Sequence, residues 1–266
     1  MGYHKLDTII HPYGVREEPK KKKKLLKIAT PAASYRRTYR VCASSAFMEW
    51  VRIASVKFIA ALRYELGDHH TYEFVEGTLP CSSDQAIAAL FTSTEDSFAY
   101  FDVTNIPTCK KALLDLDAYI RTEGPFDGGI AFSQGAALLS TYITWKFMSD
   151  PTAQHLAPVF KCAIFISAGL PVDPIALLER DEMKSLRFAE HGEVIPIPTA
   201  HIWGTGDTAW REQSEEVKSL CKKDAAVAFV HPGGHEVPSS GALKDSVPGM
   251  VQAVRKTIHK ALSAHV

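Results

Sequence analysis

The chain has 266 residues, 46% of them hydrophobic, which is enough to bury one sizeable core and predicts a single folded domain. Lys plus Arg and Asp plus Glu number 30 each, so the overall charge does not argue for nucleic acid or an anionic membrane as a partner. Five scattered cysteines without C-x-x-C spacing predict neither a disulfide framework nor a zinc site, and we expect no metal or cofactor.

The first forty residues are strongly basic. They hold eleven Lys or Arg against three acidic residues, a net charge of +8, and the rest of the chain therefore carries −8. The unbroken run Lys20 to Lys24 repels itself and cannot bury apolar area, so we predict a structure-poor segment over 1–33 and a mildly acidic domain over 34–266. The run also matches nuclear-import and nucleic-acid-binding segments, but a solvated face is its commoner role, and we expect no nucleic-acid partner.

The sequence contains no segment typical of membrane insertion or export. No run of about eighteen apolar residues is present, so no membrane span is expected. The N-terminus also lacks the apolar stretch followed by small residues that a signal peptide needs. We therefore expect a cytoplasmic protein, with a nuclear location as the alternative that the lysine run leaves open.

In chain order, the first predicted element of the domain is a helix from Met48 to Leu66, whose apolar residues recur at helical spacing before Gly67 ends it. A short strand follows over 71–75. Residues 80–107 mix Ser, Thr and Asp with aromatic residues, which is typical of a packed connection. This connection supplies the candidates for lining a substrate pocket, namely Phe98, Tyr100 and Phe101.

The second half of the chain alternates between strand and helix patterns. A helix with a face of Leu113, Leu116 and Ile120 precedes the apolar run 130–132. The later predicted strands cover 163–167, 199–203 and 225–230, and the later helices cover 134–147, from 174, 212–222 and 247–264. Such alternation predicts an α/β fold with a mainly parallel sheet and helices on both faces, whose sites gather at the carboxyl ends of the strands.

Ser133 is the candidate nucleophile. Ala131-Phe132-Ser133-Gln134-Gly135 is a G-x-S-x-G nucleophile elbow with Ala in the first position, between a predicted strand and a predicted helix. The tight turn needs small residues on either side of the serine, and Ala131 is the largest residue expected to fit there. The helix that follows aims its first N–H groups at the site, so the Gln134 N–H can donate to an oxyanion.

His235 and Asp207 are the candidate base and acid. His235 lies in a Gly-rich loop between the last strand and the last helix, and Asp207 follows the strand before that loop. The order Ser, Asp, His is the one that α/β-hydrolases use. Asp173, one strand earlier, is the rival acid, and Asp207 is favoured on its strand position.

These three residue types belong together chemically. A serine hydroxyl is a weak nucleophile until a neighbouring base takes its proton, and the histidine would act as that base. A buried carboxylate would hold the tautomer and stabilise the imidazolium that forms. The pattern predicts an acyl-enzyme that water then hydrolyses.

Several stretches resemble the fungal family of serine hydrolases usually called the FSH family, which also includes a human ovarian-cancer-associated relative. Coverage runs from about Phe58 to the C-terminus, and the most specific part is the G-P-F-D-G run that leads into F-S-Q-G-A. The stretches are 61–67, 74–77, 100–102, 124–136, 165–167 and 233–235. The resemblance implies an α/β-hydrolase of carboxylesterase or thioesterase type (EC 3.1) acting on a small acyl ester or thioester.

The resemblance leaves two further questions. Fungal members of this family often occur next to polyketide synthases, so the resemblance also implies a carrier-bound acyl or polyketide substrate in secondary metabolism. Family members normally open with a strand ending in Leu-His-Gly, whose loop supplies a second oxyanion donor, whereas residues 39–47 contain no such motif. A degraded first strand is therefore expected. The alternative function is an impaired member that binds an acyl ligand or a protein.

Overall fold

The structure is a computed structural model that describes residues 49–53, 59–67, 70–81, 97–239 and 241–264. The predicted basic segment 1–33 and the region 39–47 lie outside these ranges. Within the described part, none of the helices combines the length and the apolar character needed to cross a bilayer. Cys109, Cys162 and Cys221 are buried free thiols.

Six parallel strands form the central sheet, in the order β2-β1-β5-β6-β7-β8. Their carboxyl ends therefore lie along one edge, where loops meet. β5 and β6 are almost fully buried and consist of small and apolar residues, as expected of inner strands covered on both faces. The strands are β1 (Glu49–Ile53), β2 (Thr71–Phe74), β5 (Gly128–Phe132), β6 (Cys162–Ile166), β7 (Thr199–Gly204) and β8 (Ala226–His231).

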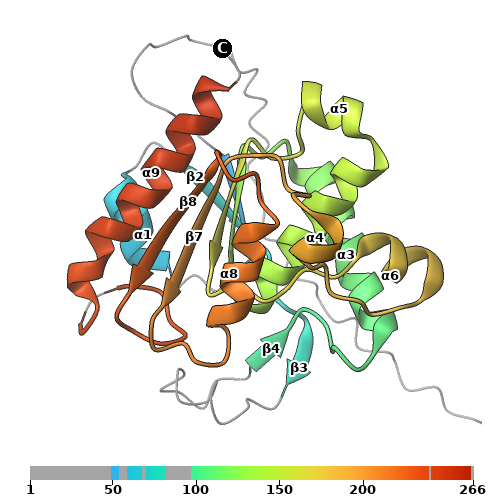
Figure 1. The fold of residues 1–266 in the computed structure, drawn as a ribbon, viewed down its shortest axis with the longest axis horizontal. Coiled ribbons are helices and arrows are strands. Elements are labelled where there is room, and N and C mark those ends of the chain that lie inside the picture. The colour runs from blue at the N-terminus through green and yellow to red at the C-terminus, as the bar shows by residue number, and fades with distance from the viewer. Residues whose placement is uncertain (1–48, 54–58, 68–69, 82–96, 240, 265–266) are drawn as a thin grey trace, which may run out of the picture. The chain divides into compact units, whose positions relative to one another are not determined.

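Helices cover both faces of this sheet (Figure 1). On one face, α1 (Ala60–Leu66) and α9 (Val247–Ser263) pack on Ile130, Ile164 and Ile202. On the other, α3 (Ile106–Glu123), α4 (Gln134–Ser149) and α8 (Arg211–Ser219) enclose a second apolar cluster. The shorter helices are α5 (Pro151–Leu156), α6 (Pro174–Arg180), α7 (Phe188–His191) and the 3-10 helix η2 (Lys244–Ser246). The predicted fold class is confirmed.

The predicted helix from Met48 to Leu66 is wrong in its first part. Glu49–Ile53 is strand β1, and α1 begins only at Ala60, although Gly67, with φ 85°, ends it as predicted. The β-branched residues Val51 and Ile53 favour a strand, and the backbone of β1 pairs on both sides, with β2 and with β5. A short apolar run fits the periodicity of a helix and that of a strand equally well. Here the pairing of the segment with two neighbouring strands makes it a strand.

Strand β1 can be compared with the prediction that the first strand is degraded. The region 39–47, in which that damage was expected, lies outside the described residues, whereas β1 itself is a fully paired inner strand. Residues 54–58, which follow β1, are also outside the described ranges. The absence of a second oxyanion donor therefore stays a prediction.

A two-stranded antiparallel sheet lies beside the elbow. It joins β3 (Leu79–Cys81) to β4 (Ser97–Ala99), and almost all of it lies in the predicted packed connection 80–107. Tyr100, directly after β4, donates its backbone N–H at 2.8 Å to the side chain of Gln134, the first residue of α4. The small sheet thus reaches the end of the main sheet where the candidate residues lie.

Candidate active site

Ser133 occupies a strained turn between β5 and α4. Its φ of 53° and ψ of −121° are rare for a residue with a side chain and typically cost about 1–3 kcal/mol. The turn is held by a hydrogen bond from the Ser133 N–H to the Ile166 carbonyl at 3.0 Å and by N–H groups of α4 that donate to the Ser133 carbonyl. Ala131 is fully buried, which agrees with the need for a small residue there.

The structure brings Ser133, His235 and Asp207 into one hydrogen-bonded chain. The Ser133 Oγ lies 2.9 Å from the His235 Nε2, and the His235 Nδ1 lies 2.8 Å from the Asp207 Oδ2. With its proton on Nδ1, the ring donates to the carboxylate and accepts from the serine hydroxyl. The Asp207 side chain is 2% exposed and the His235 side chain 15%, so little water reaches the carboxylate.

Asp207 is held in the loop between β7 and α8. Its Oδ1 accepts a hydrogen bond from the Trp210 N–H at 3.2 Å, while its Oδ2 faces His235. The Arg211 N–H donates to the Asp207 carbonyl. Both carboxylate oxygens therefore have a partner, and the side chain has a single orientation toward the imidazole.

The loops that carry the acid and the base are hydrogen-bonded to each other. The Thr205 N–H donates to the His231 carbonyl at 2.8 Å and the Gly206 N–H to the Gly233 carbonyl at 2.9 Å. A Cβ on Gly204 would lie 2.1 Å from the Gly233 carbonyl oxygen, so only glycine allows this approach. The nearby His231 is buried, its Nδ1 accepts from the Gly233 N–H, and burial lowers its pKa.

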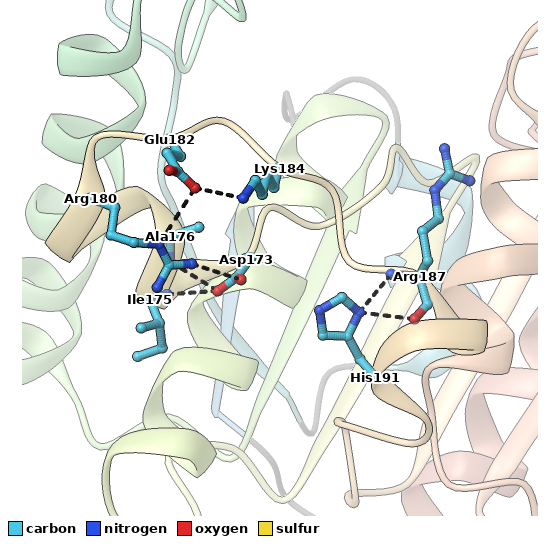
Figure 2. Close-up of polar contacts among 8 residues, drawn as sticks. All are labelled: Asp173, Ile175, Ala176, Arg180, Glu182, Lys184, Arg187 and His191. Atoms are coloured by element: carbon cyan, nitrogen blue, oxygen red, sulfur yellow. Dashed lines mark hydrogen bonds and ion pairs between the residues drawn. The ribbon is translucent and has the colours of Figure 1, made fainter.

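Asp173, the rival acid, has a structural role at α6. Its Oδ1 accepts hydrogen bonds from the N–H groups of Ile175 and Ala176 at 2.9 and 3.0 Å, which caps the helix. Its Oδ2 lies 3.7 Å from Arg180. Figure 2 shows this carboxylate turned toward Arg180 and the first N–H groups of α6. The structure thus joins Asp207, and not Asp173, to His235.

The same view shows the polar contacts that follow α6. Glu182 pairs with Arg180 and, at 2.7 Å, with Lys184, and the lysine hydrogen bond lowers the pKa of Glu182 (Figure 2). The His191 Nδ1 on α7 lies 3.2 Å from the backbone nitrogen and 3.0 Å from the carbonyl oxygen of Arg187, which precedes the helix. Both sets of contacts lie in the connection between β6 and β7 and help to order it.

Gln134 is held through its side chain. Its Oε1 accepts from the N–H groups of Tyr100 and Phe101 at 2.8 and 3.4 Å, and its Nε2 donates to the Phe101 carbonyl at 2.8 Å. The Gln134 backbone N–H opens α4, and such first N–H groups have no partner within the helix. The sequence predicted a backbone role for this residue, but gave no sign of the side-chain clamp, whose partners lie 33 and 34 residues away.

The three candidate pocket residues differ in position. Phe98 is 52% exposed on β4, and Phe101 is buried in the apolar cluster under α3 and α4. The Tyr100 hydroxyl donates to the Val75 carbonyl at 3.0 Å, and burial raises its pKa. Tyr100 and Phe101 therefore act here through their backbone, as the groups that hold Gln134, and Phe98 alone presents a largely exposed ring.

Two aromatic rings beside the base were not among the predicted site residues. The rings of Phe132 and Trp210 lie 5.0 and 5.4 Å from the His235 ring, centroid to centroid. Phe132 is a neighbour of Ser133 in sequence, which is the one signal that could have pointed to it. Trp210 follows Asp207 by three residues, but only the fold brings its ring to the imidazole.

Comparison with known proteins gives the family. A profile described as serine hydrolase (FSH1) matches residues 55–247. The chain is 38% identical over 206 residues to esterase FPY3 of Fusarium mangiferae, covering 76% of this chain and 89% of that protein. It is 36% identical over 140 residues to esterase OVCA2 of Danio rerio, covering 52% and 51%.

Among solved structures, a carboxylesterase from Mesorhizobium loti matches with a TM-score of 0.51 at 14% identity, covering 78% of this chain and 88% of that one. This likeness shows the α/β-hydrolase fold. The family profile and the relative from Fusarium confirm the resemblance to the FSH family. The chain belongs to the serine hydrolase (FSH1) family.

Proposed function

We propose that this serine hydrolase cleaves small acyl esters or thioesters through an acyl-enzyme on Ser133. The observation that carries the proposal is the hydrogen-bonded chain from the Ser133 Oγ through His235 to Asp207, with links of 2.9 and 2.8 Å. Such links meet the distance that proton transfer to a general base requires. The role of each residue follows from its place in this chain.

In the first half of the reaction, the Ser133 Oγ attacks the carbonyl carbon while its proton passes to the His235 Nε2. Asp207 stabilises the imidazolium that forms. The carbonyl oxygen becomes an oxyanion, which accepts a hydrogen bond from the Gln134 N–H at the start of α4. The tetrahedral intermediate then collapses, the bond to the leaving alcohol or thiol breaks, and the leaving group takes the proton from Nε2.

In the second half, water attacks the acyl-enzyme. His235 takes a proton from that water, a second oxyanion forms at the same position, and the Ser133 Oγ leaves as the hydroxyl after regaining the proton. The products are a carboxylic acid and the free enzyme. The aligned triad, with its carboxylate almost fully buried, supports this catalytic function over the alternative of an impaired acyl-ligand or protein-binding member.

The substrate part of the proposal includes thioesters, among them acyl or polyketide chains bound to a carrier. The same steps cleave both substrate types, because the leaving thiol or alcohol needs only the proton on Nε2. A panel of matched acyl chains tests this, each presented as a p-nitrophenyl ester and as an N-acetylcysteamine thioester. Saturable turnover of thioesters, abolished in Ser133→Ala, supports the proposal, and turnover of esters alone would restrict it to ester hydrolysis.

A further inference from the structure

The imidazole of His235 is flanked by two aromatic rings. The centroid of the Phe132 ring lies 5.0 Å from that of His235 at an interplanar angle of 43°, and the centroid of Trp210 lies 5.4 Å away at 34°. Both distances are within the range of about 6 Å in which a cation is attracted to the face of an aromatic ring. The hydrogen bonds to Ser133 and Asp207 hold the two nitrogens of the imidazole, and the two aromatic rings lie beside the imidazole ring itself.

The two rings reach His235 from opposite faces of the sheet. Phe132 ends β5 and packs with the cluster under α1 and α9. Trp210 precedes α8 on the other face, where its ring lies 3.6 Å from the position of a Cβ on Gly169, itself 3.5 Å from the Ala137 Cβ of α4. Elements on both faces of the sheet therefore bring an aromatic ring to the imidazole.

Asp207 couples Trp210 to the base. Its Oδ1 accepts from the Trp210 N–H and its Oδ2 from the His235 Nδ1. One carboxylate thus sets the position of the imidazole and of the backbone that carries the indole. A Cβ added to Gly169 would lie 3.6 Å from both the indole and the Ser133 carbonyl oxygen, so Gly169 is close to Trp210 and to the turn of Ser133.

We propose that Trp210 and Phe132 are positioning residues for the base. They hold the imidazole plane so that Nε2 faces Ser133 and Nδ1 faces Asp207, and their ring faces stabilise the imidazolium formed during acyl transfer. This inference rests on the proposed function for its kinetic consequence. Because the ring carries a charge only after Ser133 has given up its proton, the benefit appears in kcat and leaves KM nearly unchanged.

The kinetic test compares Trp210→Leu with Trp210→Phe. Loss of the aromatic face should lower kcat about 10-fold with KM within about twofold, and Phe should restore most of kcat. Phe188→Leu, which removes a half-exposed ring on α7, is the matched control and should leave both constants unchanged. Equal kcat in the wild type and Trp210→Leu would overturn the inference, as would equal losses in the Leu and Phe variants.

A spectroscopic measurement tests the same inference without turnover. The proton NMR signal of the hydrogen on the His235 Nδ1 reports how well the ring is held and shielded from water. We expect faster exchange with water in Trp210→Leu and in Phe132→Leu, and nearly wild-type exchange in Trp210→Phe. Two sites on different elements keep the test decisive if one Leu variant does not fold.

The two measurements separate the two claims. A wild type that hydrolyses no substrate but shows the Leu-specific increase in exchange would contradict the proposed function and support the positioning role. A wild type that hydrolyses esters, with unchanged exchange and unchanged kcat in both Leu variants, would support the proposed function and contradict the positioning role.

Discussion

Asp207 and Asp173 show how one residue type takes two roles in this fold. Asp207 is almost fully buried and faces His235, whereas Asp173 caps α6 through two backbone N–H groups. Asp207→Asn should lower kcat by about 10⁴, because an amide can stabilise the wrong imidazole tautomer and does not balance the imidazolium charge. Asp173→Asn is the control, and since Asn is also a good cap it should change neither kcat nor thermal stability much. Reversed effects in steady-state kinetics would place the acid one strand earlier.

His201 gives the protein a pH-dependent stability away from the catalytic residues. It is buried on β7, its Nε2 lies 2.9 Å from the Thr199 Oγ1, and burial, aided by the charge of Lys218, lowers its pKa to about 3 from the ordinary 6.5. The folded protein therefore keeps this ring neutral while the unfolded chain protonates it below about pH 6.5. The stabilising contribution is complete above that pH and is lost as the pH falls toward 3.

Urea unfolding between pH 7 and pH 5 measures this effect. A single such group contributes a slope of up to about 1.4 kcal/mol per pH unit below 6.5. His201→Asn should be less stable at pH 7 but should lose less stability on acidification than the wild type. Burial also lowers the pKa of His231, so this residue contributes to the pH dependence of stability as well. Its contribution is the same in both proteins and cancels in the comparison. Identical slopes in the two proteins would rule out His201 as the source.

At the scale of elements, the close contact between the loop after β7 and the loop after β8 sets the position of the base. A Cβ on Gly204 would meet the backbone of Gly233 at 2.1 Å, so Gly204→Ala must push the loop of His235 away. We expect kcat to fall by at least about 10², because misplacing a catalytic group by about 1 Å has an effect of that size.

Gly192→Ala provides the matched control for Gly204→Ala. Gly192 has a φ of 66° and open space around it, so its substitution strains the backbone without touching the site. It should lower the melting temperature while leaving kcat per folded molecule unchanged. If Gly204→Ala keeps wild-type kcat, the contact between the two loops does not position His235.

Features that depend on local sequence could be predicted, whereas features that depend on distant residues could not. Ser133 was predicted because the elbow depends on local residues, namely a strand, small neighbours and a helix, all of which the sequence displays. β1 was mistaken for the start of a helix because its short apolar pattern fits both periods, and its pairing with β5 involves residues far away in sequence. The β3–β4 pair and the rings around His235 were missed for the same reason, since their contacts form only when the sheet assembles.

For the whole molecule, the predicted basic segment 1–33 should be dispensable for chemistry. Among the residues whose side chains the structure describes, those that form the hydrogen-bonded chain and the buried parts of both apolar clusters lie between 59 and 261. Deleting 1–33 should therefore leave kcat per folded molecule within a few-fold of the full chain, measured against the same ester panel. A large drop in kcat with an unchanged circular dichroism spectrum would mean that this segment takes part in the site.

The central claim is that Ser133 becomes acylated with His235 as its base and Asp207 behind it. Intact-mass spectrometry with peptide mapping after reaction with a fluorophosphonate tests it directly. We predict one covalent adduct on Ser133 in the wild type, none in Ser133→Ala, and much slower labelling in His235→Ala and Asp207→Asn. An adduct that persists in Ser133→Ala, or a wild type that stays unlabelled while folded, would contradict the account.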